Sequence, residues 1–468
     1  MLYWKNLLLG ERQRKSESKS PPYRNEFDKD YERIIYSSSL RRLQDKAQVF
    51  PLQNNDFTRT RLTHSLEVAS LGRSLAWNIG EWLIQKEYYF KDLAKAKELA
   101  SLVEVSCLVH DLGNPPFGHY GEDIIRKWFE DWFESKTFES ASERFGELTE
   151  QQKCDFLYFE GNAQAIRILS KLQFLNDEYG ANFTLATLGT LMKYPWASND
   201  KKNKSRKKKK FGYFYSENEL FEEIKNKIGI DGCRHPATYI LEAADDIAYL
   251  TADIEDAVKK KVVDWDKIYK TLKHELEDMY PDEFFKLEEL RKKAMFNEVP
   301  NRDLINVQNF KVYIQGILIF AVVNSFKDNY DSIMAGTFEG DLLSNSTART
   351  LSKKLSSVAS DYVFSDKEVL TLELVGDRVI SDLLNLFINA VISVDGLTEV
   401  KTKHEKLIHL ISENFRHIQR ISKKGEPTVE FKDLTLYNRL QLVTDFISGM
   451  TDGYAVNLHQ ELLGVKLP

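Results

Sequence analysis

Apolar side chains recur at helical spacing along most of the chain. Leu99 and His110 lie at the two ends of a series in positions i, i+3, i+4, i+7, i+8 and i+11, which share one face of a helix. No stretch alternates apolar and polar residues for long, as a half-buried strand would. We therefore predict an all-α fold, with helices over 32–48, 59–79, 99–110, 125–151, 159–169, 184–193, 236–260, 265–295, 307–328, 345–358, 367–393, 401–423 and 432–450.

The first part of the chain differs from this pattern. Residues 10–30 are polar and contain two adjacent prolines, which predicts a mobile N-terminal arm over 1–31. In the helix predicted to follow, Ile34 and Ile35 are expected to face the core.

Composition narrows the class of protein. The 468 residues carry 65 Lys and Arg against 71 Asp and Glu, a net charge of −6, which excludes a general binder of polyanions. Cys107, Cys154 and Cys233 are widely separated, which favours a reducing compartment without disulfides. No signal peptide is evident, and the most apolar segment, 312–326, is too short to span a bilayer. We expect a cytoplasmic protein that does not bind a membrane.

One segment has the opposite charge. Residues 201–210 contain eight basic residues in ten, inside a loop expected over 197–212. Such a run is most often a solvated, flexible loop. It could also close over a polyphosphate or attract nucleic acid at the surface.

The stretch His110 to Glu122 carries the strongest chemical signal. His110 lies on the buried face of a helix that Gly113 and the following prolines must end. Asp111 follows it directly, and His119 and Glu122 come just after the turn. This combination indicates a metal site with an acid–base pair attached; the alternative is a helix terminus with incidental polar residues.

Two other segments could complete such a site. Arg61 and His64 lie on about the same face of their predicted helix, and a cation beside a metal ligand is useful where a phosphate is expected. Asp245, Tyr249 and Asp253 form a polar stripe at i, i+4 and i+8 on an otherwise apolar helix. A buried carboxylate needs a partner, and a metal ion is the strongest one.

Four strings in this order resemble a known family. RTRLTHSLEV, HDLGNPPFGHYGE, FEGNAQAIRIL and EAADDIAYLTADIEDA are similar to segments of the HD-domain metal-dependent phosphohydrolases, and in particular to the dGTPase branch of the deoxynucleoside triphosphate triphosphohydrolases. The resemblance covers about 32–260. It implies an HD-type helical catalytic core there, with an additional helical C-terminal region over 261–468 packed on it.

The resemblance implies a metal centre with four ligands. His64, His110, Asp111 and Asp245 match the ligand positions of the family. Asp245 is chosen over Asp246 because the polar stripe continues from it. Two imidazoles and two carboxylates suit Mn²⁺ or Mg²⁺, with Fe²⁺ or Zn²⁺ also compatible.

The resemblance also implies a catalytic pair and sugar contacts. His119 matches a residue that protonates the departing 5′-oxygen or, in the reverse geometry, activates water, and Glu122 matches the residue that orients it. Which of these two roles His119 performs stays open. Tyr249 and Asp253 match positions that hold the 3′-hydroxyl of the deoxyribose, where a tyrosine can exclude a 2′-hydroxyl.

Further substrate contacts follow in the same way. Arg61, Lys193 and Tyr194 match phosphate contacts. Asn162 and Gln48 resemble other positions around the substrate, and Gln48 is the residue expected to meet the base.

The function implied is metal-dependent hydrolysis of a dNTP, most readily dGTP, to deoxynucleoside and inorganic triphosphate. The alternatives are another HD-type nucleotide phosphohydrolase or phosphodiesterase, or a nucleic-acid-responsive regulatory protein with weak turnover. The family also implies a single-stranded DNA or nucleotide effector and a homo-oligomer, for example a hexamer. Base selectivity and the native metal stay open.

Overall fold

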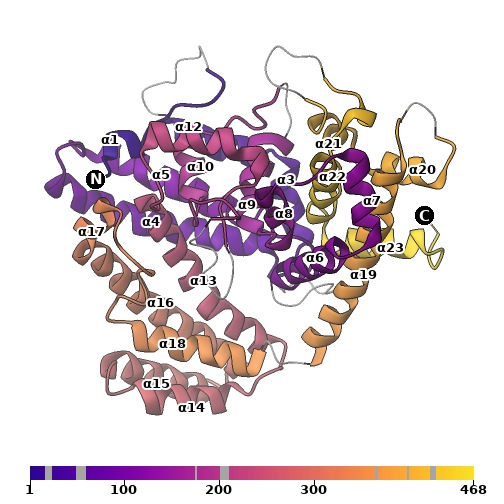
Figure 1. Ribbon diagram of the computed structural model, residues 1–468. Coiled ribbons are helices and arrows are strands. Elements are labelled where there is room, and N and C mark those ends of the chain that lie inside the picture. Colours follow the sequence, from indigo (N-terminus) through magenta and orange to yellow (C-terminus); the bar gives the residue numbers. More distant parts are fainter. Residues whose placement is uncertain are drawn as a thin grey trace.

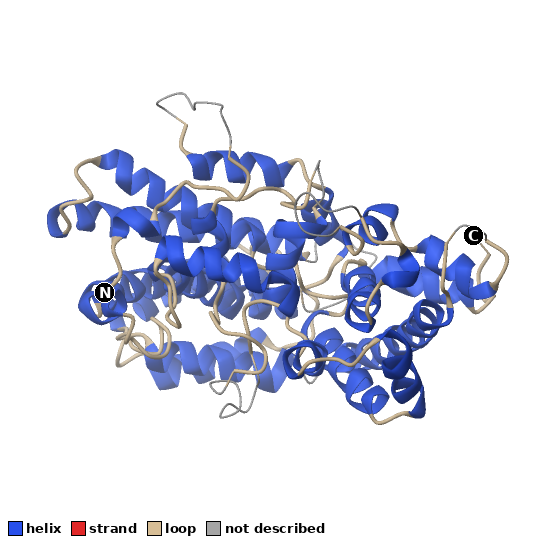
Figure 2. Cartoon of the chain, turned by 45° about the horizontal axis from the view of Figure 1, so that its top comes forward, coloured by secondary structure: helices blue, strands red, loops and turns tan. Residues whose placement is uncertain are grey.

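The structure is a computed structural model that describes residues 1–15, 24–48, 59–173, 177–200, 210–363, 367–397, 400–421 and 428–467. Helices form all the regular secondary structure of these residues (Figures 1 and 2), apart from three isolated β-bridges. The predicted all-α class is confirmed.

The helices of the first half of the chain are α1 (Trp4–Leu7), α2 (Glu26–Ile35), α3 (Ser38–Arg42), α4 (Arg61–Lys86), α5 (Leu93–Val109), α6 (Gly118–Phe133), α7 (Lys136–Phe145), α8 (Glu150–Leu157), α9 (Gly161–Arg167), α10 (Leu185–Leu191), α12 (Asn218–Ile228) and α13 (Pro236–Lys259). Those of the second half are α14 (Trp265–Leu276), α15 (Pro281–Phe296), α16 (Arg302–Asp328), α17 (Tyr330–Ala335), α18 (Arg349–Val358), α19 (Lys367–Ser393), α20 (Lys403–Leu410), α21 (Glu413–Ile418), α22 (Leu436–Ser448) and α23 (Asp452–Leu462).

Three long helices form the centre of the molecule. α4 packs along α5, and α13 packs against both. Gly72 makes the close approach of α4 and α5 possible, since a Cβ there would lie 2.4 Å from the sulfur of Cys107. In Figure 1, α14, α15, α16 and α18 gather at the lower end of α13, while α19 to α23 lie on the other side of α6. The start of α4, the end of α5 and the middle of α13 carry His64, His110 and Asp245, and these three residues lie close together.

Two of the predicted helices are broken by serine caps. The helix expected over 32–48 begins earlier, in α2, and ends before Ser37, whose hydroxyl accepts the Leu40 N–H and starts α3. Ile35 is exposed and not in the core as expected, whereas Ile34 is buried. The helix expected over 125–151 is divided in the same way at Ser135, which caps α7.

The described part of the expected N-terminal arm is packed against the core. The Arg12 guanidinium is buried, pairs with Asp30 and donates to the carbonyl of Asn182 at 2.6 Å. Trp4 is also buried and donates to the hydroxyl of Tyr330. Side chains before residue 15 thus have partners far along the chain, and the N-terminal arm over 1–31 stays a prediction.

One described helix, α16, is long and apolar enough to cross a membrane by length and composition. It has 27 residues, so the segment 312–326 is part of a longer helix than the sequence indicated. One face of α16 packs on α13 and α15, and Phe310, Ile314 and Leu318 are buried there. The helix thus belongs to the packed helical assembly of the second half.

A buried ionic cluster connects α9 with α22. Arg167 donates to both carboxylate oxygens of Asp445 and, at 2.8 Å, to Glu217. Gln164 and Gln419 donate to the same aspartate, at 3.0 and 2.9 Å. Because all these groups are buried, the removal of one member leaves a desolvated charge without its partner.

We therefore expect Asp445→Ala to lower the free energy of unfolding by about 3–5 kcal/mol, the usual cost of breaking a buried ion pair. Urea denaturation followed by circular dichroism measures the change. Asp395→Ala is the control, because the ion pair of Asp395 with Arg144 is exposed and its loss should have little effect. Equal destabilisation by the two substitutions would contradict the role given to this cluster.

Candidate metal centre and catalytic site

Three of the four predicted metal ligands meet where α4, α5 and α13 converge. His64, His110 and Asp245 each offer a ligand atom, and these atoms lie within 4.8 Å of one another. The Nε2 atoms of His64 and His110 lie 3.0 and 3.4 Å from the same oxygen of Asp245. Burial alone would raise the pKa of Asp245, but the two imidazoles and Lys193 outweigh it and hold that pKa well below its usual range.

The position of His110 at the end of α5 prepares it to bind a cation. Its Nδ1 lies 2.6 Å from the carbonyl oxygen of Cys107, one turn earlier, and donates to it. That bond leaves Nε2 free to act as an electron-pair donor, and Nε2 is buried without a hydrogen-bond partner. An orphaned imidazole nitrogen beside a carboxylate fits a divalent metal ion.

The fourth predicted ligand, Asp111, lies beside this group with other partners. Its Oδ1 is 3.5 Å from Nε2 of His110 and accepts the side-chain N–H of Asn114, while Oδ2 accepts a hydrogen bond from Arg61 at 2.7 Å. Burial favours the neutral acid, yet Arg61 and the imidazoles of His110 and His64 hold the pKa of Asp111 well below its usual range. Asp111 is therefore an anion next to the centre, and its role as a ligand stays a prediction.

A tight turn leads from this centre to His119 and Glu122. Phe117 has a φ of 61°, in the left-handed region, and Gly118 has the same φ. A Cβ on Gly118 would lie 2.4 Å from the guanidinium of Arg61, and the left-handed backbone also favours glycine at this position. The turn starts α6, which directs His119 outward with 75% of its side chain exposed and Glu122 inward, where it is buried.

The buried carboxylate of Glu122 contacts the exposed imidazole of His119. Its Oε2 lies 3.3 Å from Nδ1 of His119, and its Oε1 accepts the N–H of Gly161 at 2.8 Å. Burial alone would raise the pKa of Glu122, but the bond to His119 and the charges of Lys210 and Arg126 lower it to about 2. Glu122 is thus a fixed carboxylate at neutral pH, and it orients the imidazole.

A second buried glutamate lies next to Glu122. Glu160 accepts a hydrogen bond from Asn162 at 2.6 Å and pairs with Lys210 at 2.6 Å. Arg126 lies within 3.5 Å of both glutamates. Burial, followed by repulsion from Glu122, raises the pKa of Glu160. Two carboxylates and two cations therefore lie together on the buried side of His119: those of Glu122, Glu160, Arg126 and Lys210.

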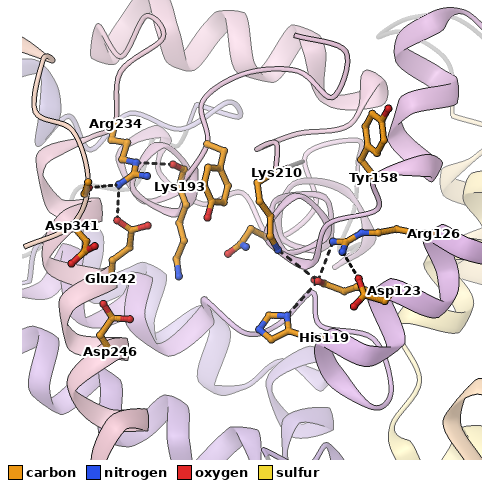
Figure 3. Close-up of a pocket in the computed structure, with 14 residues that line it drawn as sticks. His119, Asp123, Arg126, Tyr158, Lys193, Lys210, Arg234, Glu242, Asp246 and Asp341 are labelled. Carbon is orange, nitrogen blue, oxygen red and sulfur yellow. Dashed lines mark hydrogen bonds and ion pairs between the residues drawn. The ribbon is translucent and has the colours of Figure 1, made fainter. Parts of the chain in front are cut away.

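A cavity of about 780 Å³ opens above these groups. Figure 3 shows His119, Asp123 and Arg126 at one end, Glu242, Asp246 and Asp341 at the other, and Lys193 between them. Lys193 also lies 3.6 Å from Asp245, so it connects the cavity with the metal centre. Burial lowers the pKa of Lys193, but Asp245 and Glu242 outweigh it and raise that pKa, which keeps the ammonium charged.

The predicted site residues fall into two groups. Lys193, Tyr194 and Asn162 line the cavity, as do His119 and Glu122. The rest of the predicted set does not occur among the described residues that line it: Gln48, Arg61, His64, His110, Asp111, Asp245, Tyr249 and Asp253.

The polar stripe on α13 continues into the interior. Asp253 is buried, and burial together with nearby Asp256 raises its pKa to about 8. Burial and then Asp246 and Asp245 raise the pKa of Tyr249. Both groups are therefore neutral at pH 7 and can donate hydrogen bonds. Asp246, which the sequence analysis set aside in favour of Asp245 as a ligand, lines the cavity, and burial raises its pKa well above normal.

Sequence reasoning missed several charged residues of the cavity. Arg126, Arg234 and Glu160 had no motif to distinguish them, although Glu160 directly precedes Gly161 in one of the matching strings. Lys210 ends the basic run that was proposed to close over a polyphosphate, and its ammonium lies in the cavity. The rest of that run, 201–209, lies outside the described residues.

Comparison with known proteins agrees with this geometry. The HD domain family matches residues 61–167, and the phosphohydrolase-associated domain family matches residues 391–461. A deoxyguanosinetriphosphate triphosphohydrolase-like protein of Listeria monocytogenes is 43% identical over 99% of this chain and 100% of its own length. One of Pseudomonas aeruginosa is 34% identical over 99% of both chains. The deoxyguanosinetriphosphate triphosphohydrolase of Salmonella paratyphi A is 33% identical over 94% of both.

The centre predicts how metal affinity responds to substitution. His110→Ala and Asp245→Ala each remove one of the clustered donor atoms and should weaken Mn²⁺ binding more than about 100-fold, beyond the effect of changing a supporting residue. Electron paramagnetic resonance of free Mn²⁺ measures the affinity.

His119→Ala is the matched control, because it removes an imidazole of the same site that lies outside the cluster and should leave the affinity unchanged. Asp111→Ala in the same titration tests whether that carboxylate is a ligand. Tight binding by both the His110 and the Asp245 variant would contradict the centre.

Proposed function

We propose a reaction for this chain, which belongs to the HD-domain phosphohydrolase family of deoxyguanosinetriphosphate triphosphohydrolase-like proteins. The proposed reaction is hydrolysis of a deoxynucleoside triphosphate to deoxynucleoside and inorganic triphosphate, with dGTP as the expected substrate. The observation that carries the proposal is that the cavity lined by His119 and Glu122 adjoins the cluster of candidate metal ligands. His119 and Glu122 lie at one end, and Lys193 links it to the cluster of His64, His110 and Asp245.

The donor set supports a divalent cation in that cluster. Two imidazoles and a carboxylate, with the carboxylate of Asp111 beside them, suit Mn²⁺ or Mg²⁺ and are compatible with Fe²⁺ or Zn²⁺. When bound, such an ion polarises the α-phosphate and stabilises the negative charge that develops on it.

The side chains of the cavity account for the rest of the reaction. Water adds to the α-phosphorus, the bond from that phosphorus to the 5′-oxygen breaks, and the departing oxygen takes up a proton. His119 is the exposed acid that supplies this proton, and Glu122 holds its imidazole through Nδ1 so that Nε2 points into the cavity. The proton that the water loses passes to solvent or to a nearby base.

The cations of the cavity serve the triphosphate. Lys193, Lys210 and Arg126 line the cavity together, and their positive charges can stabilise the negative charge of the triphosphate product. Arg61 donates to Asp111 at the edge of the metal centre, and a phosphate contact is assigned to it, as the family resemblance implies. Deoxyribose recognition is assigned to Tyr249 and Asp253, whose neutral hydroxyl groups can hydrogen-bond to the 3′-hydroxyl.

Product analysis tests this proposal. The purified protein with Mn²⁺ and each dNTP, with GTP as a further substrate, should release deoxynucleoside and triphosphate, which ion-exchange chromatography separates. We expect His119→Ala to lower kcat about 10²–10⁴-fold, the usual contribution of a general acid.

His274→Ala is the control, since His274 is exposed on α14 and should have no effect. Release of nucleoside monophosphate and pyrophosphate would instead assign a different phosphohydrolase reaction. Turnover of GTP as fast as dGTP would contradict the role of Tyr249.

A further inference from the structure

One carboxylate of the C-terminal region holds two segments of the site at once. Asp452, the first residue of α23, is buried. Its Oδ1 accepts the backbone N–H of Phe117 at 3.0 Å, and its Oδ2 accepts the backbone N–H of Ala47 at 2.8 Å. Phe117 precedes the helix that carries His119, and Ala47 precedes Gln48. Asp452 thus joins two segments that each lie more than 300 positions before it in the chain.

Lys46 makes a parallel connection. Its ammonium is buried and donates to the carbonyl oxygen of Asn114 at 2.5 Å and to that of Ser448 at 2.9 Å. The side chain of Asn114 in turn donates to Asp111 beside the metal centre. The carbonyl of Lys46 accepts the N–H of Arg61 at 2.9 Å. The end of α22 is therefore tied to the turn between His110 and His119.

The same turn is also held by packing. The ring of Phe117 lies against Gly376 of α19, where a Cβ would come within 2.7 Å of the ring. Gly121 lies close to the side chain of Ile380, also on α19. Phe117 has a left-handed backbone, which is unfavourable for a residue other than glycine and persists only where its surroundings fix it. The hydrogen bond to Asp452 and the packing against Gly376 hold the backbone of Phe117 in this conformation.

We propose that Asp452 is a positioning residue for His119, and that the C-terminal region from α19 to α23 acts as a clamp that fixes the turn between His110 and His119. The clamp keeps the strained backbone of Phe117, and with it the start of α6, in the geometry that presents His119 to the cavity. Its kinetic consequence rests on the function proposed above, whereas its structural consequence does not.

The test compares two substitutions at one position. Asp452→Asn keeps the shape but replaces one acceptor oxygen by a donor, so one of the two backbone N–H groups loses its partner. Asp452→Ala leaves both without one. A displacement of about 1 Å in a catalytic group can cost about 100-fold in rate, so we expect kcat to fall about 10-fold for the asparagine and about 100-fold for the alanine. KM should change less than about twofold, because the cavity cations are not displaced.

The matched control is Asp382→Asn. Asp382 lies in the same C-terminal region, on α19, and pairs with His459 and Arg378 at 2.8 Å. Neither of these partners belongs to the turn, so the loss of the Asp382 charge reports the general destabilisation of this region. We expect a comparable fall in melting temperature with unchanged kcat.

Hydrogen–deuterium exchange provides a readout that needs no turnover. Peptides covering 112–122 should exchange at least about tenfold faster in Asp452→Asn than in the wild type and in Asp382→Asn, while peptides of α5 stay protected. Unchanged exchange of the turn in Asp452→Asn would overturn the proposal, as would faster exchange with unaltered kcat. An equal loss of kcat in Asp452→Asn and Asp382→Asn would overturn it as well. If the wild type hydrolyses no dNTP but the turn opens selectively, the proposed function fails and the clamp stands.

Discussion

The desolvated negative charge of Asp111 and Asp245 is the constraint on which the rest of the site depends. Two buried carboxylates a few ångströms apart repel each other and favour protonation unless cations surround them. Lys193 and Arg61 supply the positive charge, and His64 and His110 supply ring nitrogens next to the carboxylates; these residues come from α4, α5 and the segment after α10. These elements must therefore meet at one point, which explains why α4, α5 and α13 form the packed centre of the molecule.

The same constraint links the metal centre to the catalytic turn. The guanidinium of Arg61 donates to Asp111 and also lies against Gly118, which is in the left-handed turn that begins α6. The turn cannot maintain that backbone alone. It takes hydrogen bonds and packing from α19, α22 and α23, so residues of both matched ranges, 61–167 and 391–461, meet at this turn.

The sequence predicted what depends on local spacing. The end of α5 at His110, the proline start of α13 and the polar stripe on α13 could all be read because a helix period and a turn residue specify them. Helix interruptions at Ser37 and Ser135 were missed, since a serine inside an apolar period is visible as a cap only when the hydroxyl finds the N–H three residues on. Glu160, Lys210 and Asp452 were missed for another reason: their roles come from partners brought near by tertiary packing, which no single-chain pattern encodes.

The charge arrangement of the cavity indicates how it can select a polyanion without holding a costly excess of positive charge. Lys210 and Arg126 are already paired with Glu160 and Glu122, and Arg234 with Glu242. An unpaired cluster of half-buried cations would destabilise the fold, whereas paired cations do not carry that cost. In the reaction proposed above, the triphosphate replaces these carboxylates as the partner of Lys210 and Arg126. Glu122 keeps its position next to His119 whichever partner the cations have, because the N–H of Gly161 holds its second oxygen.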